Sequence, residues 1–227
     1  MAQIGNCPFE TAASLCISYT AAPILFLHLG LERPDTKSVE KRDERVLIWG
    51  ISSSLGAVAT QLASQAGYAV VGVASGHHTE LGKSLGLAHF VDRTSPTVVD
   101  ELVALGPFKA VLSAADSPED RGKVADVVAA HGGGEFIVAS GPYQGTTLPD
   151  GVRATSRPFV ADLMDEENKN LREWLFWNYL EDVIANDKLK SLPLDVKTGF
   201  SHVEEAWNLL REGKVSGKRV VIIPDTA

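Results

Sequence analysis

A short turn rich in glycine and serine carries the residues best suited to chemistry in this sequence. It follows the apolar run 46–49 and contains Gly50, Ser52, Ser53, Ser54 and Gly56. Backbone N–H groups and hydroxyls in such a turn donate hydrogen bonds, and a helix starting there adds the positive end of its dipole. The turn therefore predicts a phosphate-binding loop. Its spacing departs from G-x-G-x-x-G, so an ordinary strand–turn–helix unit is the alternative interpretation.

A second group of polar side chains follows the next apolar run, 68–74. Proteins that prefer NAD end this strand with a carboxylate, which hydrogen-bonds the ribose 2′-hydroxyl. Here the run ends at Ser75, and His77, His78 and Lys83 come next. A hydroxyl followed by basic side chains suits a 2′-phosphate, so this strand end predicts NADP(H) as the cofactor. Histidines solvated in a surface loop are the alternative.

The elements around these two groups alternate between strand and helix. The first strand, the turn, a helix over 57–66 and the second strand form a βαβ unit of about 30 residues. Further apolar runs at 89–92, 109–115 and 135–141 are separated by helical patterns. This alternation predicts an α/β fold, a doubly wound parallel sheet of the Rossmann type. The segment 152–160 is a candidate for one more strand.

Composition and charge limit the classes of protein to which this chain can belong. The chain has 227 residues, of which 44% are hydrophobic and 22% charged, as in soluble globular proteins. A formal net charge of −8 argues against a nucleic-acid-binding surface. The two cysteines, Cys7 and Cys16, have no partners at metal-site spacing. We therefore expect no metal site and a reduced, cytoplasmic protein.

One apolar stretch, 11–31, is long enough to resemble a membrane span, because His28 is its only basic side chain and it has no acidic one. Pro23 and several Ser and Thr residues interrupt it, and its first half is rich in Ala and Ser rather than Leu. We therefore expect helices packed against the sheet and no membrane span.

A helix predicted over 171–185 carries two of the four tryptophans and is apolar over most of its circumference. Such a helix is buried, lies in an interface or lines a pocket. Core packing is the simplest interpretation, and a substrate pocket is the alternative. The candidate lining residues are Tyr143, Trp174, Trp177 and Tyr179.

Several short motifs, taken in order, resemble one known family. They are FETAA (9–13) with YTAA (19–22), SGHHTELGKSLG (75–86) with FVD (90–92), and GF (199–200), EEA (204–206) and GKVSGK (213–218). Together they resemble the medium-chain dehydrogenase/reductase superfamily, on its zinc-independent side of quinone oxidoreductases and fungal trans-acting enoyl reductases. The likeness runs over 9–223, and its specificity lies in the order of the motifs.

The resemblance implies a division of the chain. The dinucleotide-binding domain would span 20–190, and the segments 1–19 and 191–227 would be remnants of the substrate domain packed against it. In the family an N-terminal GroES-like domain shapes most of the substrate pocket, and this chain begins after the corresponding position. The family's catalytic residues in that domain have no matching positions in this sequence, so the resemblance assigns no catalytic residue.

The resemblance also assigns residues to parts of the cofactor. It places Thr20 at the nicotinamide, and its other assignments are Ser52, Ser53 and Ser54 at the pyrophosphate with Ser75 and Lys83 at the 2′-phosphate. Arg93 stands where fungal members often have Tyr beside the adenosine phosphate. Ile51 stands where the family usually has Gly or Ala, so we expect its side chain to crowd the pyrophosphate turn.

Three functions fit these observations. The first is an NADPH-dependent reductase of an enoyl or quinone-type substrate in secondary metabolism, with a polyketide-derived small molecule as one candidate substrate. The second is a cofactor-independent isomerase or cyclase on the same scaffold, and the third is a module that senses NADPH without chemistry. We also expect a homodimer formed through 135–141 and 152–160, which resemble the edge through which family members pair.

Overall fold

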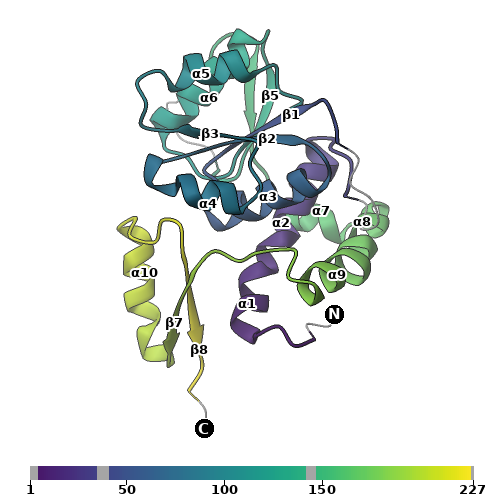
Figure 1. Ribbon diagram of the computed structural model, residues 1–227, viewed down its shortest axis with the longest axis vertical. Coiled ribbons are helices and arrows are strands. Elements are labelled where there is room, and N and C mark those ends of the chain that lie inside the picture. Colours follow the sequence, from purple (N-terminus) through teal and green to yellow (C-terminus); the bar gives the residue numbers. More distant parts are fainter. Residues whose placement is uncertain (1–4, 35–40, 142–146, 226–227) are drawn as a thin grey trace.

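In Figure 1, a parallel sheet forms the upper part of the structure, a computed structural model that describes residues 5–34, 41–141 and 147–225. Its six strands run in the order β3-β2-β1-β4-β5-β6, and every neighbouring pair is parallel. The strands are β1 (Arg45–Trp49), β2 (Ala69–Ala74), β3 (His89–Asp92), β4 (Ala110–Ser113), β5 (Gly134–Val138) and β6 (Val152–Thr155). This order is that of a dinucleotide-binding Rossmann sheet, which confirms the predicted fold class.

Helices cover both faces of the sheet. They are α1 (Phe9–Ser14), α2 (Ser18–Pro23), α3 (Ser54–Gln65), α4 (Thr79–Ser84), α5 (Val98–Leu105), α6 (Pro118–Ala130), α7 (Phe159–Met164), α8 (Lys169–Glu173), α9 (Leu180–Ala185) and α10 (Val203–Arg211). Because side chains alternate along a strand, Val46 and Ile48 of β1 pack in the cluster formed with α2 and α3. Leu47 and Trp49 pack on the opposite face, with α5 and α6. Burial on both faces explains why the strands read as continuous apolar runs.

The C-terminal part forms a separate unit. Two parallel strands, β7 (Leu194–Thr198) and β8 (Arg219–Ile223), pair with each other, and α10 connects them beside the main sheet (Figure 1). Helix α1 packs against this pair, and Arg219 Nη1 donates to the carbonyl of Ser14 at 2.8 Å. Helix α1 and the C-terminal strand pair are thus in contact, and the division of the chain at 19 and 191 stays a prediction.

Two features of the chain differ from the expectations. The strand expected over 152–160 stops at Thr155, because Pro158 has no N–H for a strand ladder and Phe159 begins α7. The expectation was therefore wrong for the second half of that segment. Strand β7 has no clear pattern of apolar residues in the sequence, because its side chains are half-buried or exposed.

The apolar N-terminal stretch is a set of packed helices. The segment Phe9–His28 is long and apolar enough to cross a membrane, by length and composition only, and 44% of it is buried within the structure. Helix α2 contacts α3 and α7, and Ala21 and Ala22 are completely buried there. A helical turn, Ile24–His28, continues α2 beyond Pro23. The expected packing of these helices is present.

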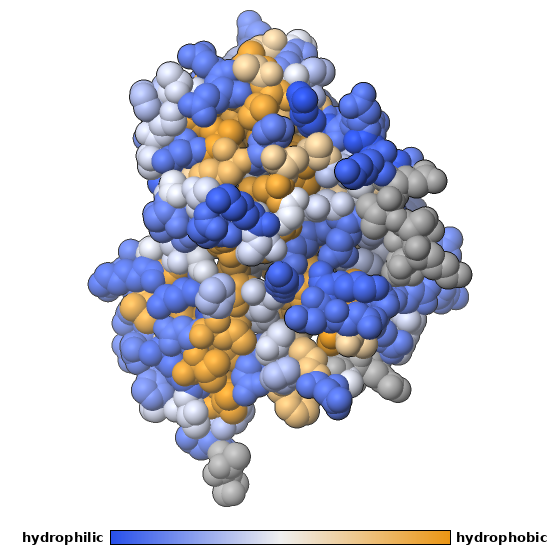
Figure 2. Space-filling view, viewed as in Figure 1, coloured by the Kyte–Doolittle hydropathy of each residue, from blue (hydrophilic) through white to orange (hydrophobic). Residues whose placement is uncertain are grey.

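Exposed apolar side chains gather on the C-terminal unit. Figure 2 shows an apolar area at the lower left, over the region of β7, β8 and α10. The exposed large residues of that unit are Val196, Phe200, Val203, Trp207 and Leu210. The other large apolar side chains that are exposed among the described residues are Phe9, Val160, Met164 and Trp177.

Candidate functional site

A cleft runs along the carboxyl ends of the sheet strands, around the point between β1 and β4 where the strand order reverses. It consists of two adjoining hollows of about 450 and about 480 Å³, which share Ala115 and Asp116. Polar residues at five strand ends contribute to its wall: Gly50 after β1, Ser75 after β2, Arg93 after β3, Asp116 after β4 and Ser140 after β5. Ligands of doubly wound sheets bind at this position.

The glycine- and serine-rich turn forms the middle of the cleft. Gly50, Ser52 and Ser53 line the first hollow, and Gly50 has a φ of 86° that favours glycine. Ser53 caps α3, because its Oγ accepts a hydrogen bond from the Gly56 N–H at 3.0 Å and donates to the Gly50 carbonyl at 2.8 Å. Gly56 is buried against Gly50. The turn and the start of α3 therefore have the form of a phosphate site.

Ser54 and Ile51 face away from this cleft. Ser54 begins α3 and lines a small space beside Ser14 on the other side of the turn. The Ile51 side chain is completely buried and lies close to Gly72, where a Cβ would be 3.0 Å from Ile51 Cγ2. Neither residue lines the first hollow. The expected crowding of the pyrophosphate by Ile51 is therefore wrong, because its side chain is part of the core.

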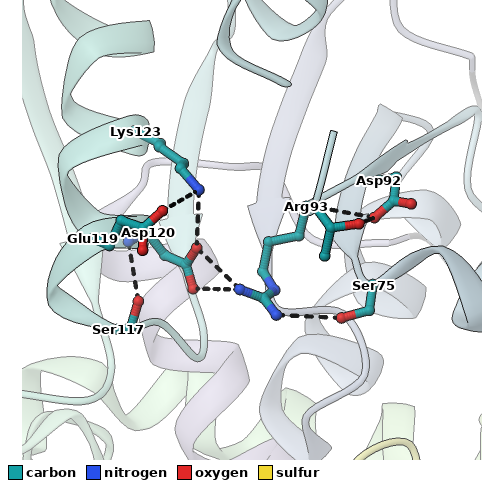
Figure 3. A network of polar contacts seen from close by, with 8 residues as sticks. Ser75, Asp92, Arg93, Ser117, Glu119, Asp120 and Lys123 are labelled. Atoms are coloured by element: carbon teal, nitrogen blue, oxygen red, sulfur yellow. Dashed lines mark hydrogen bonds and ion pairs between the residues drawn. The ribbon is translucent and has the colours of Figure 1, made fainter. Parts of the chain in front are cut away.

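One end of the cleft is built around Arg93, which reaches across it (Figure 3). Arg93 Nη2 donates to Ser75 Oγ at 3.4 Å, while Nη1 lies 3.3 Å from Asp120 Oδ2. Arg93 is 39% exposed at its side chain, whereas Asp120 is 7% exposed. Asp120 also forms an ion pair with Lys123, whose Nζ lies 3.9 Å from Asp120 Oδ1. The backbone N–H of Asp120 donates to Ser117 Oγ at 3.1 Å, so Ser117 caps α6. A cation thus lies beside the Ser75 hydroxyl, held loosely by a buried carboxylate.

Asp92 lies at the same end of the cleft, next to Gly76. It accepts hydrogen bonds from the N–H and hydroxyl of Thr94, at 2.9 and 2.8 Å. The backbone N–H of Thr94, followed by its hydroxyl, lowers the pKa of Asp92 below its ordinary value. A Cβ on Gly76 would collide with this carboxylate, so Ser75 and β3 approach each other closely at this position.

Two of the basic residues predicted near the 2′-phosphate lie differently from expectation. Lys83 projects from α4, pairs with Glu80 at 2.6 Å, and does not line the cleft. His78 is buried, at 8% exposure, and its Nε2 lies 2.9 Å from Ser216 Oγ. Burial, and then the neighbouring His77, lower the pKa of His78. His78 is therefore not a solvated loop residue, because it packs against the C-terminal unit.

The C-terminal unit closes one side of the first hollow. The Gly217 N–H donates to the Ser52 carbonyl at 3.1 Å, and Leu210, Gly213, Val215 and Ser216 line the hollow. Apart from the motif GKVSGK, no sequence pattern indicates these wall residues, because their approach to the loop depends on the tertiary fold.

A buried ion pair lies where the two hollows meet. Arg121 donates from Nε to Asp116 Oδ2 at 2.9 Å and from Nη2 to Oδ1 at 3.2 Å, and both side chains are at most 3% exposed. Ser140 Oγ donates to Asp116 and accepts from Arg121 Nη2 at 2.9 Å. This network ties α6 to the ends of β4 and β5. Sequence reasoning missed it, because Asp116 looked like part of an ordinary exit turn.

The second hollow forms the other end of the cleft. Thr20 lines it from α2, and its predicted role at the nicotinamide stays a prediction. Of the aromatic residues predicted to line a substrate pocket, Trp174, Trp177 and Tyr179 line neither hollow. Tyr179 is 1% exposed and donates to Gln65 Oε1 at 2.6 Å, and burial raises its pKa. Trp174 stacks on Tyr179 at 4.8 Å.

These aromatic residues therefore belong to the packed helix series, so the pocket interpretation is corrected for Trp174, Trp177 and Tyr179. Trp177 is half exposed on the same series and lines neither hollow. Tyr143 lies outside the described residues. Among residues 5–34, 41–141 and 147–225, no group of three or more His, Cys, Asp or Glu side chains is arranged to hold a metal ion.

Comparison with known proteins shows what this chain is similar to. No family model matches the chain. The chain is 34% identical to the trans-enoyl reductase himH of Aspergillus japonicus over 95% of its own length and 62% of that protein. Its fold is similar to that in the crystal structure of CurK enoyl reductase, with a TM-score of 0.72 and 21% identity over 99% of this chain and 65% of the other. These matches agree with the resemblance to the medium-chain dehydrogenase/reductase superfamily that the sequence motifs carry.

Another solved structure with a similar fold, a quinone oxidoreductase of Pseudomonas syringae pv. Tomato, has a TM-score of 0.73 and 20% identity, covering 97% of this chain and 66% of that one. The chain spans somewhat less than two thirds of the length of the relative himH. The relatives himH and azaJ are named as a reductase and a dehydrogenase, and each match covers 95% of this chain.

Proposed function

We propose that the protein is an NADPH-dependent reductase of an enoyl or quinone-type small molecule in secondary metabolism. The observation that carries this proposal is the continuous cleft at the carboxyl ends of the sheet. Its middle is a capped helix start with Gly50, Ser52 and Ser53, one end carries Ser75 and Arg93, and the other is a hollow beside Thr20. The middle matches the pyrophosphate of an extended dinucleotide. The end at Ser75 and Arg93 matches its adenosine phosphate, and the hollow beside Thr20 matches its nicotinamide.

The residues present fit such a cofactor. Gly50, Ser52 and Ser53 line the hollow beside the start of α3, and the N-terminus of a helix favours an anion such as a pyrophosphate. Strand β2 ends in Ser75 rather than a carboxylate, and the Arg93 guanidinium lies 3.4 Å from its hydroxyl. A guanidinium binds phosphate oxygens well, so this end favours a cofactor with a 2′-phosphate.

When bound, the cofactor would supply a hydride from its nicotinamide ring to an electron-poor carbon of the substrate. The chain itself orients the ring and excludes water from the second hollow, where Ile17, Leu55, Phe159 and Val160 line the walls. The Asp116–Arg121–Ser140 network holds the strand ends that form its floor. No side chain here needs to act as an acid, since water can protonate the product.

Binding and turnover together test this function. Titration calorimetry with NADPH and NADH should give tighter binding of NADPH. Oxidation of NADPH, followed at its absorbance band with a panel of enones and quinones, should then identify a substrate. Conversion of substrate without NADPH, and no turnover with it, would instead support a cofactor-independent isomerase or cyclase. NADPH binding with no conversion of any kind would support a sensor.

Substitutions at Arg93 and Asp120 should change the cofactor preference in opposite directions. Arg93→Gln is expected to weaken NADPH binding about tenfold, with little effect on NADH, because one charge-assisted contact to the 2′-phosphate is lost. Asp120→Asn should strengthen NADPH binding, since it removes the carboxylate that competes for Arg93. The measurement is calorimetric titration of both cofactors.

Arg153→Gln is the matched control for Arg93, because Arg153 is an exposed arginine of β6 that pairs with Glu135 outside the cleft. Its NADPH affinity should equal that of the wild type. Equal losses of NADPH and NADH affinity in Arg93→Gln would assign Arg93 to the packing of the cleft and not to cofactor selection.

We also propose a homodimer. Among the described strands, β6 pairs with β5 alone, so its other edge has no neighbour in the sheet. An open strand edge favours pairing with another chain, and two-fold dimers are the commonest closed form. Light scattering at micromolar concentration should give twice the mass of the chain, and a monomer would contradict the proposal.

A further inference from the structure

The second hollow combines apolar walls with one arginine. Its apolar lining residues are Ile17, Leu55, Ala114, Ala115, Ala139, Pro158, Phe159 and Val160, and its polar ones are Thr20, Asp116, Ser140 and Arg157. A pocket of this kind binds an apolar ligand and uses its few polar groups to fix the ligand's orientation. Arg157 was not singled out in the sequence, and no cofactor role is assigned to it.

Arg157 is held in place by a carboxylate behind it. Its Nη2 donates to Asp162 Oδ1 at 2.9 Å, and Asp162 Oδ2 lies 2.7 Å from Nε2 of His28. The side chains of Asp162 and His28 are 12% and 19% exposed, whereas that of Arg157 is 50% exposed. The carboxylate is thus shared between two partners, while half of the arginine surface remains available to the hollow and to solvent.

The other charged residue of the wall, Asp116, does not repel an anion in the hollow. Asp116 also lines the hollow, but its carboxylate is buried, pairs with Arg121 and accepts from Ser140. A ligand in the hollow therefore meets a fixed guanidinium at one point and apolar or hydroxyl groups around it. A guanidinium presents parallel N–H groups that match the two oxygens of a carboxylate.

We propose that Arg157 binds the carboxylate of the substrate, so that the substrate class is an unsaturated acid with an apolar body. This inference rests on the proposed function, because the hollow is the end of the cleft assigned to the nicotinamide and the substrate. The unsaturated part lies against Thr20 and the apolar wall, and the carboxylate reaches the mouth of the hollow at Arg157. An arginine fork suits a carboxylate better than a neutral ester, which offers no charge.

The test compares a matched pair of probes, cinnamate and methyl cinnamate, by ligand-observed NMR titration of the full chain. Wild-type protein should bind cinnamate at least tenfold more tightly than its ester. Arg157→Gln should reduce cinnamate affinity about tenfold or more and leave ester affinity unchanged. Arg157→Lys should retain part of the preference, since it keeps the charge but not the fork.

Arg153→Gln is the control, because it removes an equal charge from an exposed residue outside the hollow. It should bind both probes like the wild type. The proposal is overturned if Arg157→Gln weakens both probes equally, if it leaves cinnamate affinity unchanged, or if the wild type binds neither probe at millimolar concentration. Thermal unfolding of each variant checks that the fold is intact.

The titration is run first without cofactor and then with NADPH, which separates this inference from the proposed function. Carboxylate binding that depends on Arg157 in a protein that does not bind NADPH would refute the reductase and keep the acid site. NADPH binding and reduction of neutral enones, with no preference for the acid, would keep the reductase and refute the role of Arg157.

Discussion

Replacing Gly56 with Ala should lower the free energy of unfolding by about 3 kcal/mol, the upper part of the range for overpacked sites. A Cβ at this position would lie 2.8 Å from the carbonyl carbon of Gly50 and 2.9 Å from Cα of Ile51, and closer still to the Gly50 carbonyl oxygen. These are backbone atoms, so the turn itself would have to shift. The shift would also disturb the hydrogen bond that the Gly56 N–H donates to Ser53 Oγ.

Chemical denaturation of both proteins measures this difference, and cofactor titration should show weaker binding, because the displaced turn is the proposed pyrophosphate site. Gly122→Ala is the matched control. Gly122 lies within α6, and a Cβ there would have nothing within 4 Å. Alanine is the better helix former by about 1 kcal/mol, so this variant should be slightly more stable than the wild type. Equal stabilities of the two alanine variants would show that the turn adapts freely.

Arg121→Met should be the second strongly destabilised variant, by about 3–5 kcal/mol, because it removes the guanidinium that forms an ion pair with the buried Asp116 carboxylate. The two side chains are 3% and 0% exposed. Ser140 would still donate to Asp116, but a hydroxyl does not replace the charge of the guanidinium. Chemical denaturation at neutral pH measures the loss.

Two further variants separate charge burial from a general effect of losing an arginine. Arg153→Met removes a surface ion pair and should cost at most about 1 kcal/mol. The double variant Asp116→Asn, Arg121→Met should recover much of the stability lost in Arg121→Met, since no buried charge remains. A double variant as unstable as the single one would assign the loss to packing around Arg121.

The alternation of apolar runs with helical patterns was sufficient to predict the sheet. Because parallel strands are buried on both faces, runs such as 46–49 contain no polar positions, and the residues that end them stand out. Gly50, Ser52, Ser53 and Ser75 could therefore be assigned to one cleft from sequence, and the structure brings these four together.

Residues on helices and distant loops were placed by the tertiary structure. Lys83 followed Ser75 closely in sequence, yet α4 directs it to Glu80 and away from the cleft. Ile51 adjoined the turn, yet its side chain is buried in the core beside Gly72. Sequence distance says which residues share a loop, but the direction of a side chain depends on the elements that pack around it.

The sequence by itself determined the α/β class, the glycine- and serine-rich turn and the hydroxyl at the end of β2, because these features are local and have a fixed spacing. Only the tertiary structure decided which charges meet: Arg93 with Asp120, Asp116 with Arg121, and Arg157 with Asp162. Each of these pairs joins a side chain that follows a strand to one on a helix, so the partners are set by how the helices pack on the sheet. Pairing energies of this kind depend on burial and geometry, which no local pattern of residue types contains.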